Sequence, residues 1–418
     1  MSIIYLILTI LLILYAENYI FGGLRQVLEN SFDWADKLWL PLTYWGISIL
    51  LPILTVAGVY FYFKTHQPNF FGKWALSLFL AVIVSKVVFL LFLLVGDTVR
   101  LIEAGWTSIA SGTSSLKGDI PGRRMFLLQS AAVVALVPFV SFIYGATKGK
   151  YRYQVFKYVL KFKDLPKSFD GYKIVQISDI HSGSFDDKNG VEKGIDLINE
   201  READLVLFTG DLVNTYASEF EPWKDVFKQI KAKDAKYSIL GNHDYGDYAR
   251  WSTQESKEEN FKDLIQCHHD IDFTLLRNQS VKIERGGESI RLIGVENWGT
   301  RFVKYGDLDL ALTDVASNEF KILMSHDPTH FDQKVIPHSE HIHITLSGHT
   351  HGMQMGVEFP WLKWSPVKYV YPKWAGLYNE KGKYLNVNRG YGFLGFSGRV
   401  GIWPEITEIE LKLDDSEG

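Results

Sequence analysis

Hydrophobic positions divide the chain into two parts with different patterns. Up to residue 147 the apolar residues gather in long runs, whereas from residue 148 onward short apolar stretches alternate with polar ones. Three long runs, 38–63, 74–95 and 125–144, have the roughly 20 apolar residues that a bilayer-spanning helix needs. We therefore predict a helical membrane region over 1–147 with about four transmembrane helices, followed by a globular domain over 148–418.

The first apolar run, 3–15, allows two interpretations. It is short for a span and resembles the core of a signal peptide, although no basic residue precedes it. If the helix continues through Glu17 and Asn18 to about Leu24, the run is long enough to cross a membrane. Lys86 lies in the middle of a later run, where a charge either has a function or faces the interior of the helical bundle.

The second part of the chain alternates stretches of strand length with stretches of helical spacing. An opening strand is predicted at 151–162, and a hairpin of 275–284 and 289–295 turns at Gly286-Gly287. Helices are predicted at 191–200, 220–230 and 255–266. Five further strands are predicted at 173–177, 205–208, 237–240, 321–324 and 343–346. Strands that alternate with helices indicate an α/β layered sheet.

Each of these five strands is followed by side chains that can bind a metal ion. They are Asp179, His181, Asp211, Asn242, His326, His349 and His351. In open α/β sheets, ligands bind beyond the carboxyl ends of the strands, so we expect these side chains to meet in one crevice. Taken singly, each of these residues has an ordinary structural explanation. An apolar strand followed by a polar ligand, repeated along one region of the chain, is not explained in that way.

The types of ligand indicate which metals the crevice suits. Mixed carboxylate, amide and imidazole ligands suit Mn²⁺, Fe²⁺ or Zn²⁺ better than Ca²⁺. The set is too large for one tetrahedral ion but suffices for two ions if one carboxylate bridges them. Two divalent metals about 3.5–4 Å apart hold a phosphoryl group and activate a water molecule. We therefore predict a site for two divalent metal ions.

Charge and cysteine content exclude other classes of site. Residues 1–150 hold 11 Lys and Arg against 7 Asp and Glu, a balance of +4, so the remainder carries −8 to reach the total of −4. An acidic globular domain argues against a nucleic-acid groove, which usually has a basic face. Cys267 is the only cysteine, which excludes an intrachain disulfide and a cysteine-based zinc site.

The order and content of the motifs resemble the calcineurin-like metallophosphoesterase superfamily. The motifs are Asp179-x-His181, Gly210-Asp211, Gly241-Asn242-His243-Asp244, His326 and Gly348-His349-Thr350-His351. The resemblance runs from about Lys173 to the end and implies a layered β-sandwich flanked by helices. The C-terminal part, including Arg399 and Glu405, looks like the membrane-associated bacterial branch. Members of that branch often carry twin-arginine signals, and some hydrolyse the pyrophosphate of UDP-diacylglucosamine.

The resemblance also implies a role for each motif residue. It places Asp179, His181, Asp211 and His351 on the first metal. It places Asp211, Asn242, His326 and His349 on the second metal. His243 would contact the phosphate and protonate the leaving oxygen as the catalytic acid.

Two positions depart from the family pattern. Asn214 stands where many relatives have an Asp that orients the acid histidine, and a neutral amide cannot stabilise an imidazolium as a carboxylate would. The acid role of His243 is therefore less secure from the sequence. Met353 replaces a common second glycine after His351, and we expect an altered loop there.

Two other stretches have unusual composition. Residues 267–270, Cys-His-His-Asp, have the side chains of a third metal site but no spaced partner, so a polar loop is the favoured interpretation. Large aromatics crowd the region 361–378; they are Trp361, Trp364, Tyr369, Tyr371, Trp374 and Tyr378. They favour either the packing of a peripheral sheet or a lip that accepts acyl chains at a membrane interface.

The side of the membrane depends on one motif. With four spans the basic residues number six on each side, so the positive-inside rule gives a tie. The stretch 122–127, with Arg123 and Arg124, looks like a twin-arginine export signal, although a plain basic flank of a membrane helix has the same composition. If it is a signal, the globular domain lies outside the cytoplasm of a bacterial inner membrane.

These observations predict a membrane-anchored, dinuclear metal-dependent phosphoesterase. We expect it to cleave a phosphodiester or pyrophosphate bond of a lipid-linked substrate, with UDP-2,3-diacylglucosamine-like lipids among the candidates, because the anchor concentrates lipids around the site. The first alternative is a nuclease or cyclic-nucleotide phosphodiesterase of the same fold. The second is a non-catalytic membrane sensor or scaffold, against which the complete ligand set argues.

Overall fold

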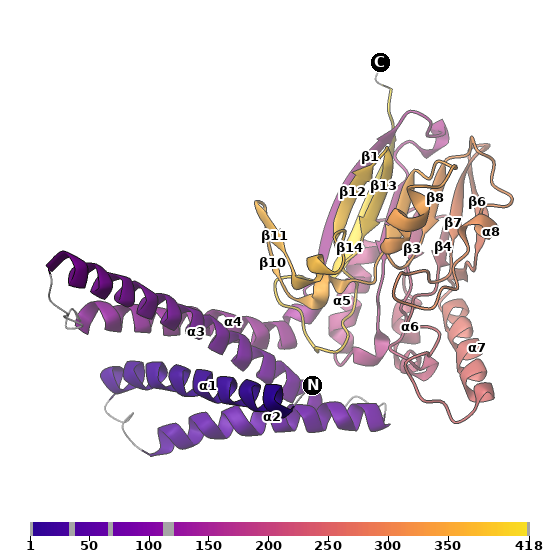
Figure 1. Cartoon of the computed structure of the whole chain (residues 1–418). Coiled ribbons are helices and arrows are strands. Elements are labelled where there is room, and N and C mark those ends of the chain that lie inside the picture. The colour runs from indigo at the N-terminus through magenta and orange to yellow at the C-terminus, as the bar shows by residue number, and fades with distance from the viewer. Residues whose placement is uncertain (1–2, 33–37, 66–69, 112–120, 416–418) are drawn as a thin grey trace. The chain divides into compact units, whose positions relative to one another are not determined.

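The computed structural model describes residues 3–32, 38–65, 70–111 and 121–415. The chain divides into two compact units, Met1–Tyr144 and Gly145–Gly418. The first contains long helices and the second contains sheets with shorter helices (Figure 1).

Four long helices account for the apolar runs. They are α1 (Ile3–Ser31), α2 (Trp39–Thr65), α3 (Phe70–Ser111) and α4 (Pro121–Thr147). All four are long and apolar enough to cross a membrane, which confirms the predicted helical region. The first run does not stop at residue 15, because α1 continues through Glu17 to Ser31.

The polar side chains at the middle of the bundle are paired. Lys86 Nζ lies 2.8 Å from Glu17 Oε2 and 2.7 Å from Ser48 Oγ. The Tyr44 hydroxyl donates a hydrogen bond of 2.7 Å to the same Glu17 carboxylate. Lys86 therefore faces the bundle interior, and its ion pair joins α1 to α3 where an unpaired charge would be costly.

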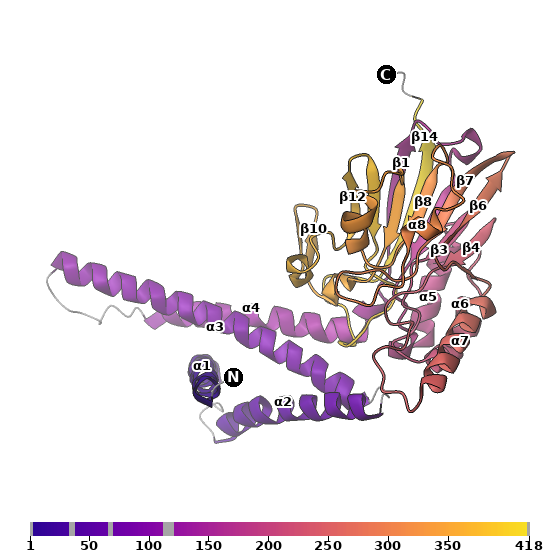
Figure 2. The ribbon, with the colours of Figure 1, turned by 45° about the vertical axis from the view of Figure 1, so that its right-hand side comes forward.

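The second unit is a β-sandwich (Figure 2). One sheet has the strand order β1-β14-β2-β3-β4-β5, and the other has the order β12-β13-β9-β8-β7-β6. The strands of the first sheet are β1 (Gln154–Phe162), β2 (Lys173–Ile177), β3 (Leu205–Phe208), β4 (Ala235–Ser238), β5 (Thr274–Leu275) and β14 (Glu405–Leu413). Those of the second are β6 (Gln279–Arg285), β7 (Glu288–Gly294), β8 (Lys321–Met324), β9 (Ile344–Ser347), β12 (Gly376–Glu380) and β13 (Lys383–Val387). A separate hairpin pairs β10 (Val357–Phe359) with β11 (Leu362–Trp364).

Alternate side chains of one strand serve two different cores. Leu205 and Leu207 of β3 face the other sheet and belong to the core between the sheets. Val206 and Phe208 belong to the core beneath the helices α5 (Lys188–Asn199) and α7 (Gln254–Asp270). A strand buried on both faces has no polar positions, which is why it reads as an unbroken apolar run. Helices thus flank the sandwich, as the fold prediction stated.

Three local predictions are wrong. The expected helix at 220–230 is a 3-10 turn at Glu221–Trp223 followed by the single α-helical turn α6 (Lys224–Phe227). The strand expected at 237–240 is β4 at Ala235–Ser238, so residues 239–240 lead into the loop. Residues 267–270 are the last turn of α7 rather than a polar loop, and His268 is buried against Phe208.

Candidate metal centre

The seven predicted ligand side chains follow the carboxyl ends of strands in both sheets. Asp179 and His181 follow β2, Asp211 follows β3, and Asn242 follows β4 in the first sheet. His326 follows β8, and His349 and His351 follow β9 in the second sheet. Strands β2, β3 and β4 run parallel, as do β8 and β9, so within each sheet these ends point the same way.

The backbone at these positions is unusual. Asp179, His181, Asp211, His349 and His351 all have positive φ, between 47° and 72°. The left-handed conformation costs free energy for residues with a Cβ and persists only where surrounding contacts enforce it. Here the strand ends are held by hydrogen bonds, for example from the Asp179 amide to the Gly210 carbonyl at 2.9 Å. Strained residues of this kind cluster at functional sites.

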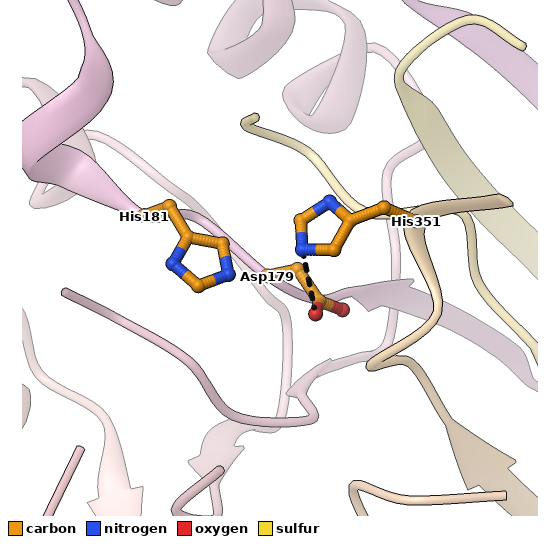
Figure 3. A group of neighbouring side chains, drawn as sticks. All are labelled: Asp179, His181 and His351. Carbon is orange, nitrogen blue, oxygen red and sulfur yellow. Dashed lines mark ion pairs between the residues drawn. The ribbon is translucent and has the colours of Figure 1, made fainter. Parts of the chain in front are cut away.

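The first cluster joins Asp179, His181 and His351 (Figure 3). One ligand atom from each lies within 4.8 Å of the others, and all three side chains are buried. His351 Nε2 lies 3.2 Å from Asp179 Oδ1. The Asp179 carboxylate also accepts hydrogen bonds from the His349 amide, with both oxygens at 3.0 Å, which fixes its position between the two sheets.

Asp211 belongs to two further clusters. One contains His181 and His243, and the other contains His326 and His349. Asp211 Oδ2 is 3.5 Å from His181 Nε2 and 3.1 Å from His326 Nε2. The same carboxylate therefore lies between ligand atoms of both sheets. That is the position a bridging ligand needs.

The donor atoms fit a metal ion. His181 is fully buried, and neither of its ring nitrogens has a hydrogen-bond partner among the described residues. Burial lowers the pKa of His181 well below its usual range, so the imidazole stays neutral with a lone pair to offer. A buried imidazole without partners is costly unless something else occupies its lone pair.

The carboxylates make the centre strongly attractive to positive charge. Burial lowers the pKa of His326, but the neighbouring Asp211 carboxylate outweighs that effect and raises it to about 10. Burial raises the pKa of Asp179, but the His351 imidazole outweighs it, and the pKa ends below its ordinary value. A divalent cation bound among these groups would balance the same negative charge.

Asn242 contacts His349 rather than standing alone. Its Oδ1 lies 2.8 Å from His349 Nδ1, and its amide donates to the Tyr248 hydroxyl at 2.8 Å. The other ring nitrogen of His349 lies 2.9 Å from the Tyr371 hydroxyl. Tyr248 and Tyr371 thus complete the rim of the centre. Tyr248 carried no sequence signal, and Tyr371 was one aromatic among several.

His243 has an acceptor despite the departure at Asn214. His243 Nδ1 lies 2.7 Å from the backbone carbonyl of Asn214, so this nitrogen donates and Nε2 is left facing Asp211 and His181. The amide of His243 donates to Asp211 Oδ1 at 2.8 Å. The Asn214 side chain points elsewhere and donates to Ser184 Oγ at 3.1 Å. A backbone carbonyl thus orients the ring where the sequence suggested a missing carboxylate.

Two buried residues that sequence reasoning did not assign support the centre. The Asp244 carboxylate accepts hydrogen bonds from the amides of Asp211, Leu212 and Gly241, at 2.8–2.9 Å, and so fixes two ligand loops against each other. Arg399 is fully buried, and its Nη2 lies 3.3 Å from His351 Nδ1. The only sequence signal for Asp244 and Arg399 was a charged residue within a polar motif.

The loop after His351 keeps a backbone conformation that suits glycine, although Met353 stands in it. Gly352 and Met353 have φ of 56° and 52°, so Met353 adopts a left-handed conformation that suits glycine. Its side chain is 47% exposed and lies outside the buried centre. The expected alteration of the loop is therefore an exposed apolar side chain beside His351.

Comparison with known proteins gives matches over both units. A family described as "Calcineurin-like phosphoesterase" matches residues 172–353. A second, described as "Probable Calcineurin-like phosphoesterase, transmembrane domain", matches residues 1–150. The chain thus combines a metal-dependent phosphoesterase domain with a transmembrane region of a type already associated with it.

Relatives come from vertebrates as well as bacteria. "Transmembrane protein with metallophosphoesterase domain" from Danio rerio is 25% identical over 386 residues, which cover 89% of this chain and 82% of the relative. "Uncharacterized metallophosphoesterase YkuE" from Bacillus subtilis (strain 168) is 28% identical over 300 residues, 69% of this chain and 97% of the relative. This distribution does not single out a bacterial branch. Together the matches and the Asp/His clusters show a calcineurin-like metallophosphoesterase domain joined to an N-terminal four-helix transmembrane domain of the kind found with such phosphoesterases.

Proposed function

We propose that this metallophosphoesterase uses two divalent metal ions to hydrolyse a phosphodiester or pyrophosphate bond of a lipid-linked substrate. The observation that carries the proposal is the Asp211 carboxylate, which lies within reach of ligand atoms on both sheets. A single shared carboxylate between two histidine-containing clusters fits two ions better than one.

The residues would divide between the two ions as follows. Asp179, His181 and His351, which form one cluster, would hold one ion together with Asp211, which lies 3.5 Å from His181. Asp211, Asn242, His326 and His349 hold the other. Imidazole with carboxylate and amide oxygens favours Mn²⁺, Fe²⁺ or Zn²⁺. When bound, such ions supply Lewis-acid stabilisation of phosphate charge and a nucleophilic water at neutral pH.

The protein's own residues orient the substrate and move the proton. Nδ1–H of His243 donates to the Asn214 carbonyl, so general-acid catalysis uses the doubly protonated ring, whose second proton is on Nε2. From there it binds a phosphate oxygen and donates the proton to the leaving oxygen as general acid. Asp244 holds the loops of Asp211 and His243 in register without contacting the substrate.

Exposed apolar side chains beside the centre support a lipid-linked substrate. The β10–β11 hairpin projects from the sandwich (Figure 1), and Phe359 and Trp361 on it are 54% and 79% exposed. Tyr369 is 74% exposed and lies two residues from Tyr371, which contacts His349. Large exposed aromatics are costly in water and favour a membrane interface or an acyl chain. UDP-2,3-diacylglucosamine is a suitable lipid probe of this class.

The test of the metal centre replaces its shared ligand. Asp211→Asn in the full-length chain should lower metal content and turnover of bis(p-nitrophenyl) phosphate together, by at least about a hundredfold in turnover. Asp225→Asn, at an exposed carboxylate on α6, is the matched control. Two metals per chain with near-normal turnover in Asp211→Asn would refute the shared-ligand assignment.

The test of the lipid assignment changes two exposed aromatic residues, one on the hairpin and one shortly after it. Trp361→Ser with Tyr369→Ser should raise KM for UDP-2,3-diacylglucosamine by about tenfold or more, because burying one large apolar side chain contributes roughly 1.5–3 kcal/mol. KM for bis(p-nitrophenyl) phosphate should not change. Leu310→Ser, at another exposed apolar residue, is the control. Equal effects on both substrates would show that the hairpin does not contact lipid.

We further propose that the protein lies in a bacterial inner membrane with its catalytic domain outside the cytoplasm. The support is the arginine pair Arg123-Arg124 directly before the last apolar run. A C-terminal reporter that is active only outside the cytoplasm should give signal in the wild type and lose it when both arginines become lysine. A silent wild-type fusion with a bright cytoplasmic reporter would reverse the orientation.

A further inference from the structure

A side cavity lies next to the metal centre, within the second unit. It has a volume of about 170 Å³ and is lined by residues of two loops, 242–248 and 297–305. The predicted metal ligand Asn242 is part of its lining. Pockets that enclose a whole small molecule commonly have about 300–1,000 Å³. The side cavity is therefore of a size to take one part of a substrate whose reacting phosphorus lies at the metals.

The side cavity lies next to the proposed catalytic acid. Tyr248 lines it, and the centre of its ring is 4.5 Å from that of His243. The Tyr248 hydroxyl also accepts a hydrogen bond of 2.8 Å from the Asn242 amide. In the proposed mechanism His243 gives its proton to the leaving oxygen. The group that departs with that oxygen is therefore placed at the side cavity.

The loop 297–305 brings a cation to the same place. The Phe302 ring packs edge-on against the His349 ring, with the two ring centres 5.0 Å apart. Its neighbour Arg301 lines the side cavity together with Phe302. Burial raises the pKa of Tyr371, and the positive charge of Arg301 partly offsets that rise. Because the Tyr371 hydroxyl contacts His349, Arg301 lies close to the ligands predicted for the second metal.

Arg301 is a cation without a partner among the described residues. It is exposed and forms no hydrogen bond or ion pair with any of them. Two other cations nearby are matched: Lys304 Nζ lies 4.5 Å from the centre of the Trp298 ring, and Lys257 pairs with Asp247, the carboxylate in the lining of the side cavity. The side cavity therefore has an unbalanced positive charge. A guanidinium group matches the oxygens of a phosphate.

The wall of the side cavity offers an amide and flat aromatic rings. Asn297 is 1% exposed, and its side-chain oxygen has no hydrogen-bond partner among the described residues. A buried polar atom without a partner is costly, so an O–H or N–H donor on an entering group would satisfy it. The rings of Tyr245 and Tyr305 stack beside it, with their centres 3.9 Å apart. This wall suits a ring or a polar group that is attached to a phosphate.

We propose that the side cavity binds the second phosphate of a pyrophosphate substrate at Arg301, together with the group that this phosphate carries. The inference rests on the proposed function and selects one of its two bond types. Water adds its O–H to the phosphorus at the metals, and the bond from that phosphorus to the bridging oxygen breaks. The bridging oxygen leaves with the electron pair and takes a proton from His243, which regains one from the water. Two phosphate monoesters result, and Arg301 stabilises the charge on the departing one.

The first test removes the charge of Arg301 in the full-length chain. Arg301→Gln should lower kcat/KM for the symmetrical diphenyl ester of pyrophosphate by about tenfold or more, which corresponds to about 1.4 kcal/mol. Hydrolysis of bis(p-nitrophenyl) phosphate, which has no second phosphate, should change by less than about twofold. Arg301→Lys should give an intermediate loss, because lysine keeps the charge but not the planar fork of donors. Lys304→Gln, in the same loop, is the control and should leave both activities unchanged.

Binding gives a second readout of the same variant. The affinity for the diphenyl ester of methylenebisphosphonate, in which CH₂ replaces the bridging oxygen, should fall by the same factor in Arg301→Gln when it is measured by isothermal titration calorimetry. Equal losses on the pyrophosphate and the diester, or no loss on either, would overturn the proposal. If the wild type hydrolyses the diester but not the pyrophosphate, this inference fails and the proposed function stands. If it hydrolyses neither with Mn²⁺, Fe²⁺ or Zn²⁺, the proposed function fails as well.

A second variant tests whether the group on the second phosphate occupies the side cavity. Val303 lines the cavity and is 59% exposed, so a larger side chain there reduces the space without disturbing the core. Val303→Trp should raise KM for the diphenyl ester of pyrophosphate by about tenfold and leave KM for the dimethyl ester nearly unchanged. Wild-type thermal unfolding of Val303→Trp and Arg301→Gln shows that both variants fold. An unchanged KM for the diphenyl ester in Val303→Trp would mean that this group lies outside the cavity.

Discussion

Replacement of His243 by Asn removes the proposed proton donor and leaves the metal ligands in place. In the structure the ring is fixed by its contact with the Asn214 carbonyl at 2.7 Å, which leaves Nε2 facing the centre. General acid catalysis by a positioned side chain contributes about 10²–10⁴ in rate, or roughly 2.7–5.5 kcal/mol. We expect a loss of that size for a substrate whose leaving group is an alkoxide.

The loss should depend on the leaving group. A p-nitrophenolate leaves without a proton, so the His243→Asn variant should lose far less turnover on a p-nitrophenyl ester than on an alkyl ester of the same phosphate. Turnover is measured for both esters, and elemental analysis reports the metal content of each preparation. An equal loss on the two esters, with full metal content, would refute the acid role.

Asn214 provides a second arm of the same experiment. If the missing carboxylate limited His243, Asn214→Asp would raise turnover on the alkyl ester. The structure predicts no such gain, because the ring already has a backbone acceptor and the new carboxylate would lie near Glu219, whose Oε2 accepts from the backbone N–H of residue 214 at 2.6 Å. A rise of about tenfold would contradict this account.

Two further predictions concern stability. Lys86→Met should destabilise the helical unit by roughly 3–5 kcal/mol, because it removes the cation that pairs with the Glu17 carboxylate in an apolar bundle. The double variant Lys86→Met with Glu17→Gln should recover most of that stability, as measured by unfolding in SDS. Burial lowers the pKa of His268 from 6.5 to about 3. As pH falls below 6.5 the unfolded chain gains a proton that the folded chain does not, so stability is lost progressively towards pH 3. At pH 5 this lowers the free energy of unfolding by about 2 kcal/mol. Between pH 7 and pH 5, the free energy of unfolding of His268→Phe, measured by pulse proteolysis with urea, should therefore fall by about 2 kcal/mol less than that of the wild type. Equal losses in the two proteins would contradict the assigned pKa.

The sequence predicted best where a local pattern has a single structural meaning. Runs of about 20 apolar residues can satisfy their backbone in a bilayer only as helices, and the three runs of that length lie in helices, as does the shorter first run whose interpretation was left open. The short buried strands of 173–177, 205–208 and 321–324 have the same bounds in the structure. Polar residues directly after parallel strands lie at the carboxyl ends of those strands, so strand direction gathers the ligands within each sheet. The packing of the two sheets then brings the two groups of ligands together.

The sequence predicted poorly where the outcome depended on distant partners. Strand β14 inserts between β1 and β2, parallel to one and antiparallel to the other, and no local pattern encodes that choice. The helix expected at 220–230 has only one α-helical turn, although the spacing of its apolar residues is helical. The aromatic side chains of the region 361–378 differ in burial: Trp374 is buried and Trp361 is exposed, although both lie in one short segment.

What the sequence determined by itself is therefore the set of chemical groups and the edge at which they gather. Strand period and strand direction are local properties, and they suffice to bring Asp179, Asp211 and His326 to one side of their sheets. Tertiary structure alone decided the partners of those groups: Glu17 opposite Lys86, and a backbone carbonyl rather than a side chain behind His243. Backbone carbonyls are present at every residue, so a residue's identity does not reveal which of them a folded loop will present to a distant ring.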